Sequence, residues 1–196
     1  MHDMTVSSRD LRLDFFRGLA LVFIFVDHIP NNLLAYFTLA NIVFSDAAEI
    51  FVFLSGYTAA LVFGAILAQQ GPTFAIAQVL KRCWTLYVAH IFLFVVFVAQ
   101  VSYTAAKFDN PMFLDEMKVW DFLQEPHIAI LQALALRFQP HFLDILPLYI
   151  VLLLAFALIL PLLRRWPAPV LGLSLALYLA ATVFRFNLRT YPEGVW

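Results

Sequence analysis

The 196-residue chain has little charge, glycine or cysteine. Asp, Glu, Lys and Arg make up 13% of it and hydrophobic residues 63%, whereas soluble domains carry about 25% charged residues. No Gly-rich phosphate loop, His-Glu-x-x-His, Cys-x-x-Cys or Gly-x-Ser-x-Gly motif occurs. The lone Cys83 excludes an intrachain disulfide, and a net charge of −1 gives no reason to expect a nucleic-acid partner. With a mean hydropathy of +0.86, the composition predicts a protein that crosses the lipid bilayer several times.

Hydrophobic runs and turn signals divide the chain into helices. We expect spans over residues 13–29, 45–67, 83–105, 144–163 and 168–184, where apolar runs end at Pro, Gly or charged residues. Residues 107–140 form a longer polar connector, and the Leu and Ile spacing in 126–138 predicts an interfacial helix within it. The sequence therefore predicts an all-α, polytopic transmembrane bundle of about five spans.

Basic residues set the expected orientation, because Lys and Arg accumulate on the cytoplasmic side of membrane proteins. The connector over residues 33–44 contains no Lys or Arg. The basic residues of the opposite side are Arg9, Arg12, Arg17, Lys81, Arg82, Arg164 and Arg165. We therefore expect a cytoplasmic N-terminus and an external C-terminus.

The first apolar run has ionisable residues at both ends. Helical spacing places Arg17 and His28 on one stripe, about 16 Å apart, and Asp14 lies one turn before Arg17. Charges inside a membrane are costly and usually functional, so this stripe is the first candidate site. The alternative interpretation is that Asp14 and Arg17 form an ordinary pair at a helix end, and that His28 is a boundary residue before Pro30.

Acidic groups and imidazoles gather at the predicted outer end. They are Asp27, His28, Asp46, Glu49, His141 and Asp144. Such a vestibule suits a polyhydroxylated substrate that must lose a proton, and the basic opposite end suits a phosphorylated donor such as an acyl-CoA. Asp46 is equally explained as a helix N-cap, whereas Glu49 lies a turn deeper and needs a buried partner or a proton. His90 either forms a hydrogen bond within the bundle or belongs to the site.

Several of these segments resemble a known family. Arg12-x-Asp14-x-x-Arg17-Gly18 leading to His28 resembles the opening of the polytopic membrane acyltransferases. The segments similar to the OpgC family are Asp27-His28-Ile29-Pro30-Asn31, Phe44-Ser45-Asp46-Ala47-Ala48-Glu49, Phe53-Leu54-Ser55-Gly56-Tyr57, Leu86-Tyr87-Val88-Ala89-His90 and Asp144-Ile145-Leu146-Pro147-Leu148-Tyr149. The member that gives this family its name is associated with succinylation of osmoregulated periplasmic glucans.

The resemblance implies a membrane O-acyltransferase of the bacterial inner membrane. It would move an acyl group, in the family case succinyl, from cytoplasmic acyl-CoA to a glucan hydroxyl, with no bound cofactor and no metal. His28 is then the expected general base, oriented by Glu49 or Asp27. The expected substrate-binding residues are Arg12, Asp14, Arg17, Asp46, His90, Asp144 and Tyr149.

The sequence leaves several alternatives open. Intramembrane Asp, Glu and His also mark proton relays, so a proton-coupled transporter or exporter subunit is the rival function. A non-catalytic scaffold is a third reading, and direct transfer and an acyl-enzyme route are both compatible with these residues. Members of the family have about twice as many spans, so we expect residues 1–196 to form one membrane domain that is incomplete at its C-terminal end.

Overall fold

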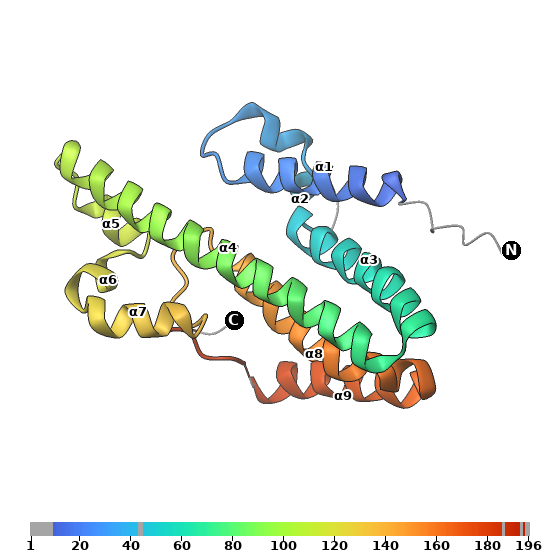
Figure 1. Cartoon of the computed structure of the whole chain (residues 1–196). Coiled ribbons are helices and arrows are strands. Elements are labelled where there is room, and N and C mark those ends of the chain that lie inside the picture. The colour runs from blue at the N-terminus through green and yellow to red at the C-terminus, as the bar shows by residue number, and fades with distance from the viewer. Residues whose placement is uncertain (1–9, 43–44, 186, 193, 195–196) are drawn as a thin grey trace, which may run out of the picture. The chain divides into compact units, whose positions relative to one another are not determined.

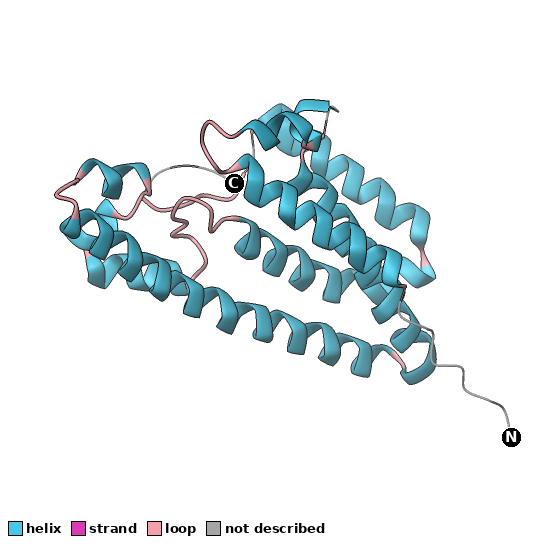
Figure 2. Ribbon diagram, turned by 90° about the horizontal axis from the view of Figure 1, so that it is seen from above, coloured by secondary structure: helices cyan, strands magenta, loops and turns pink. Residues whose placement is uncertain are grey.

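The computed structural model describes residues 10–42, 45–185, 187–192 and 194. Arg9 of the basic group and Phe44 of the family-like segments lie outside these residues. The described chain consists of helices and loops without a strand, and one isolated bridge joins Phe138 and Tyr191 (Figure 2). The described elements are α1 (Leu11–Asp27), η1 (Leu33–Phe37), α2 (Leu39–Ile42), α3 (Ala47–Gln70), α4 (Pro72–Lys107), α5 (Met112–Glu116), α6 (Trp120–Gln124), α7 (Pro126–Leu134), α8 (Ile145–Arg165) and α9 (Pro167–Phe184). The predicted all-α class is confirmed.

The chain divides into two compact units, residues 1–69 and residues 70–196. The first unit contains α1, η1, α2 and nearly all of α3, and the second contains α4 to α9. The expectation that residues 1–196 form a single membrane domain stays a prediction.

Four of the described helices, α3, α4, α8 and α9, are long and apolar enough to cross a membrane. The protein is therefore a polytopic membrane protein. The expected first span, α1, differs from these four because it has only 17 residues and carries four charged side chains. A helix of that length rises about 26 Å, less than the roughly 30 Å of a bilayer core.

Helix α4 is longer than the sequence predicted. We expected a span beginning at Cys83, but the helix begins at Pro72 and continues for 36 residues to Lys107. Gly71 precedes it with φ of +84°, a conformation that suits glycine, and Pro72 occupies a first-turn position where its missing N–H costs nothing. No helix breaker follows, so Lys81 and Arg82 lie inside the helix as exposed residues and do not flank it.

The core of the second unit forms around α4, which packs along α8 (Figure 1). This packing and the neighbouring loops bury one face of α4. The buried residues recur at helical spacing: Ala75, Val79, Cys83, His90, Phe94, Val98, Val101 and Ala105. The C-terminal half of α4 also contacts the α5–α7 region in a core cluster that includes Leu114, Val119 and Ala133. The predicted interfacial helix is present as α7 but ends at Leu134, four residues earlier than expected.

An aromatic cluster closes this core. The ring of Phe138, 1% exposed, lies 5.8 Å from Phe94 and 5.9 Å from Tyr191, centroid to centroid. Phe94 also meets Phe122 edge-on at 5.6 Å. Such pairs stabilise beyond the area that they bury, by about 0.5–1.5 kcal/mol each. The residues between α7 and α8 are therefore tied to α4 through one buried ring.

Phe138→Ala should lower the free energy of unfolding by about 3–5 kcal/mol, because it leaves a cavity where several rings meet. The measurement is the midpoint of unfolding in detergent micelles. Phe92→Ala is the matched control, because Phe92 is 67% exposed on the same helix α4. Equal midpoints for the two variants would show that Phe138 does not hold the core.

Candidate functional site

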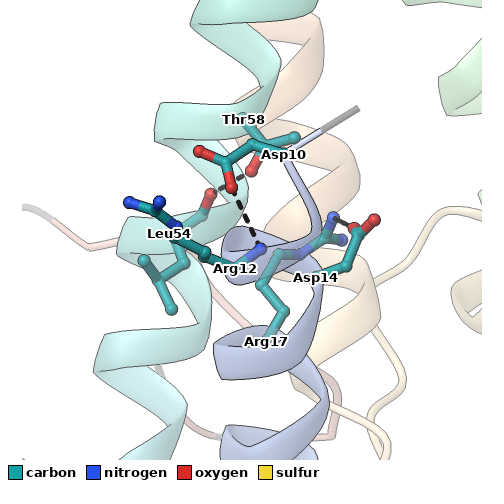
Figure 3. Close-up of polar contacts among 6 residues, drawn as sticks. All are labelled: Asp10, Arg12, Asp14, Arg17, Leu54 and Thr58. Carbon is teal, nitrogen blue, oxygen red and sulfur yellow. Dashed lines mark hydrogen bonds and ion pairs between the residues drawn. The ribbon is translucent and has the colours of Figure 1, made fainter. Parts of the chain in front are cut away.

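The N-terminal part of α1 positions Arg17. Asp10 caps the helix by accepting a hydrogen bond from the Arg12 backbone N–H at 3.0 Å. One turn later, an Asp14 carboxylate oxygen lies 3.8 Å from the Arg17 guanidinium (Figure 3). The guanidinium carbon of Arg17 lies 5.8 Å from the Phe51 ring centroid of α3, a cation–π distance. The Arg17 Nε is buried and has no hydrogen-bond partner among the described residues, so one donor of the guanidinium is unused.

The contact with Phe51 differs from the expected arrangement. The sequence predicted that the basic residues lie at one end of the bundle and the acidic residues at the other. Phe51, which Arg17 contacts, lies only two residues after Glu49. Arg17 is therefore close to the end of α3 that carries the acidic residues. Arg12 does not join it, because the two guanidinium groups point in different directions in Figure 3. The structure thus singles out Arg17 from the predicted basic group.

The C-terminal end of α1 is held by side chains of the following loop. The Thr38 hydroxyl donates to Asp27 at 2.5 Å, and Thr38 is 1% exposed. The Asn32 amide donates to the Val26 and Ile29 carbonyls, while its oxygen accepts from the Ala35 N–H at 2.9 Å and caps η1. The predicted orienting carboxylate Asp27 therefore has a hydroxyl partner in a buried position.

His28 lies at the end of α1 as its C-cap, with an exposed side chain. Its Nδ1 lies 2.5 Å from the Ile24 carbonyl oxygen. A carbonyl can only accept, so Nδ1 carries the proton and Nε2 carries the lone pair of the neutral ring. This tautomer is the one that a general base acting through Nε2 needs. The expected orienting role of Glu49 or Asp27 stays a prediction, since a backbone carbonyl already holds Nδ1.

The acidic residues of α3 form its N-terminal cap. Asp46 accepts from the Glu49 backbone N–H at 2.9 Å, and Glu49 accepts from the Ser45 hydroxyl at 2.8 Å. Both carboxylates are exposed within the first unit, together with Phe53 and Gly56 on the same face. The sequence predicted that Glu49 needs a buried partner or a proton, whereas its hydrogen-bond partner in the described chain is exposed. Ser45 precedes the first turn of α3, and its hydroxyl binds Glu49 across that turn at the surface.

Three predicted site residues belong to the second unit. Asp144 is exposed at the start of α8, and Tyr149 is buried one turn further on. His90 lies on α4 with no exposed surface, and neither ring nitrogen has a hydrogen-bond partner among the described residues. The sequence left open a hydrogen bond between His90 and another helix of the bundle. Among the described residues, His90 makes no such bond.

Sequence reasoning missed Thr38, Asn32 and Phe51 as neighbours of the site. Asn32 had a signal, because the Pro30-Asn31-Asn32 turn places an amide directly after a helix. Thr38 and Phe51 had none, since they reach Asp27 and Arg17 through the fold and not through local spacing. Among the described residues, no group of three or more His, Cys, Asp and Glu gathers as a possible metal site.

Comparison with known proteins identifies the class. Residues 9–196 match the model of the family described as OpgC protein, so the chain belongs to the OpgC family. The searches of curated proteins and of solved structures returned no match. Family membership suggests a transferase-like role in glucan modification.

Substitutions of Asp46 can separate a role in capping α3 from a role in substrate binding. Asp46→Ala should cost about 0.5–2 kcal/mol of stability because the Glu49 N–H loses its acceptor, whereas Asp46→Asn should keep the cap. Unfolding midpoints of the two variants measure this difference. If Asp46 also binds substrate through its charge, Asp46→Asn will be stable yet impaired in glucan modification. Full activity of Asp46→Asn would leave Asp46 as a cap alone.

Proposed function

We propose that this protein is an O-acyltransferase of the bacterial inner membrane, which moves an acyl group, succinyl by family resemblance, from cytoplasmic acyl-CoA to a periplasmic glucan hydroxyl. The observation that carries the proposal is the family match, which covers all but the first eight residues. The positions of the basic residues along the chain support a cytoplasmic N-terminus.

His28 is the proposed general base. Nε2 takes the proton of the acceptor hydroxyl as its oxygen attacks the thioester carbonyl carbon. The carbon–sulfur bond then breaks, an ester forms, and the proton passes to the departing thiolate to give CoA. The support for this role is the Ile24 carbonyl at Nδ1, which leaves the lone pair on Nε2. Asp27, fixed by Thr38, and Glu49, bound by Ser45, are the carboxylates proposed to orient the imidazole.

Arg17 is the proposed anchor for the anionic part of the donor. Guanidinium groups bind phosphate and carboxylate with two parallel hydrogen bonds. Arg17 is already oriented by Asp14 and Phe51, and its side chain is 23% exposed. A donor oxygen would satisfy the Nε that the described residues leave unused. Asp14, Arg12 and Tyr149 are assigned to substrate binding on resemblance alone.

His28→Ala should reduce acyl transfer by about 10²–10⁴-fold, the range of a lost general base. The assay uses the native protein in proteoliposomes with labelled acyl-CoA inside and glucan outside, and follows labelled ester and free CoA. His127→Ala is the matched control, because His127 is an exposed histidine on α7 that is not among the proposed site residues. Normal transfer by His28→Ala would exclude the role.

The same assay separates the rival function. A proton-coupled transporter would move solute across the proteoliposome without consuming thioester. Thioester loss that depends on the protein and on glucan would exclude that alternative. Solute movement with intact acyl-CoA would overturn the proposed transfer.

Arg17→Lys should weaken use of the donor by roughly ten- to a hundredfold. The ammonium keeps the charge but loses the paired geometry, and a charge-assisted hydrogen bond contributes about 1.5–3 kcal/mol. The expected change is a higher KM for acyl-CoA, with the amount of protein in the membrane unchanged. An unchanged KM would mean that Arg17 serves only to pair with Asp14 and Phe51.

A further inference from the structure

An apolar pocket lies within the second unit, between α4, α6 and α7 (Figure 1). Its volume is about 390 Å³. Its walls are five residues of α4 from Ile91 to Ala99, Phe122 of α6, and three residues of α7 from Ile130 to Leu134. An engineered apolar cavity of about 150 Å³ in another protein stays dry and binds benzene. The pocket is therefore large enough to hold a ligand, and folded proteins keep few voids of that size empty.

The walls of the pocket offer no side-chain hydrogen bond. Each of the nine lining side chains belongs to Ile, Leu, Val, Phe or Ala. The carbonyl of the lining residue Leu134 already accepts from the Tyr87 hydroxyl at 2.9 Å. A sugar or a carboxylate would lose its water here without gaining partners, whereas pockets for polar ligands carry a few polar groups that fix orientation. The part of the ligand that enters the pocket must therefore be hydrocarbon.

The pocket has a closed floor and an open side. Phe94 and Ala133 form the floor, at 4% and 2% exposure, and the Phe94 ring meets Phe122 edge-on at 5.6 Å. Val95 and Ile130 line the open side and stay 59% and 46% exposed. Because α4 is one of the helices able to cross a membrane, this open side faces the surroundings of a membrane span. Those surroundings are lipid chains.

The end of α4 sets the depth of the pocket in the bilayer. The Nζ of Lys107 lies 5.7 Å from the ring centroid of Tyr103 and 5.6 Å from that of Phe108, and such aromatic and basic groups are typical of the headgroup level. Ala99 lies eight residues, about 12 Å, before Lys107, and Ile91 lies about 24 Å before it. The headgroups occupy roughly 5–8 Å on each side of a bilayer core. The pocket thus extends from just below the headgroups to near the midplane, which is the depth of one leaflet.

We propose that this pocket binds one hydrocarbon chain of a phospholipid from the leaflet on the Lys107 side. The inference goes beyond the proposed function and does not depend on it. The phospholipid headgroup stays at the level of Lys107, whose charge suits a phosphate, and the chain descends along α4 into the pocket. There the chain supplies the dispersion contacts that an empty pocket forfeits. The bound lipid holds α6 and α7 against α4 and completes the core of this unit.

The test uses the full chain in nanodiscs that contain a trace of phospholipid with a photoreactive diazirine in the middle of one acyl chain. Irradiation labels residues that touch the chain, and peptide mass spectrometry identifies them. Labelling of α4 between Ile91 and Ala99, and of α7, should exceed labelling of α9, whose described residues are all outside the core and meet ordinary boundary lipid.

Two variants of α4 make the comparison specific. Ala99→Phe adds a ring to the pocket wall and should reduce labelling of the pocket by at least about tenfold, because displacing two buried CH₂ groups already changes affinity that much. Ala89→Phe is the matched control, because Ala89 is exposed on the same helix and does not line the pocket. It should be labelled like the wild-type protein.

Thermal unfolding in detergent gives a second measurement without a label. Added phospholipid should raise the unfolding temperature of the wild-type protein and of Ala89→Phe, because the bound chain fills the pocket. Ala99→Phe should gain much less from the lipid, since its own ring takes the place of the chain. Ala99→Leu fills less of the pocket and should gain an intermediate amount, which keeps the comparison available if the larger ring prevents folding.

Several results would overturn the inference. Pocket labelling no stronger than that of α9 would show boundary lipid alone, and equal labelling of Ala99→Phe and Ala89→Phe would place the chain elsewhere. Labelling by a diazirine fatty acid that phospholipid does not displace would assign the pocket to a free fatty acid. A dimer in native mass spectrometry that Ala99→Phe dissociates would assign it to a second copy of the chain.

Discussion

The packing of α8 along α4 is the contact on which the second unit depends. Both helices are apolar, and their buried residues lie at helical spacing along one face of each. Further elements attach to α4 beyond this pair: α5, α6 and α7 pack on its C-terminal half, where Phe94 and Phe138 meet. The hydrogen bond from Tyr87 to Leu134 fixes the end of α7 against the same helix. One continuous helix therefore organises most of this unit.

The first unit is organised by polar contacts at helix ends. Asn32 joins the end of α1 to the start of η1, Thr38 binds Asp27, and Asp46 caps α3. Each of these side chains satisfies a group that an apolar bundle would leave unmet. The proposed chemistry uses the same places, because a helix end is where ionised side chains are tolerated close to lipid. Capping and function are thus compatible roles for Asp46, and not exclusive ones.

The sequence predicted the class of the fold and most helix positions because apolar runs, Pro and Gly are local signals. It misplaced the start of α4 by eleven residues, because the basic pair Lys81-Arg82 resembles the charged end of a membrane span. The actual helix start is marked by Gly71 and Pro72. It selected His28, Arg17 and Asp46 as candidate site residues from their spacing and charge, and their roles stay predictions. The partners Phe51 and Thr38 come from the folded chain, and the buried unpaired state of His90 is a property of packing that no spacing reveals.

The length of α4 has a consequence for the surrounding lipid. Its 36 residues extend about 54 Å, and even a tilt of about 40° leaves roughly 41 Å along the membrane normal, more than the roughly 30 Å of a bilayer core. One end must therefore project. The exposed Lys81 and Arg82 fit the headgroup level, and the helix from Arg82 to Lys107 then rises about 37 Å. A thinner or thicker bilayer would shift this charged pair relative to the headgroups, so the depth at which α4 sits depends on the thickness of the membrane.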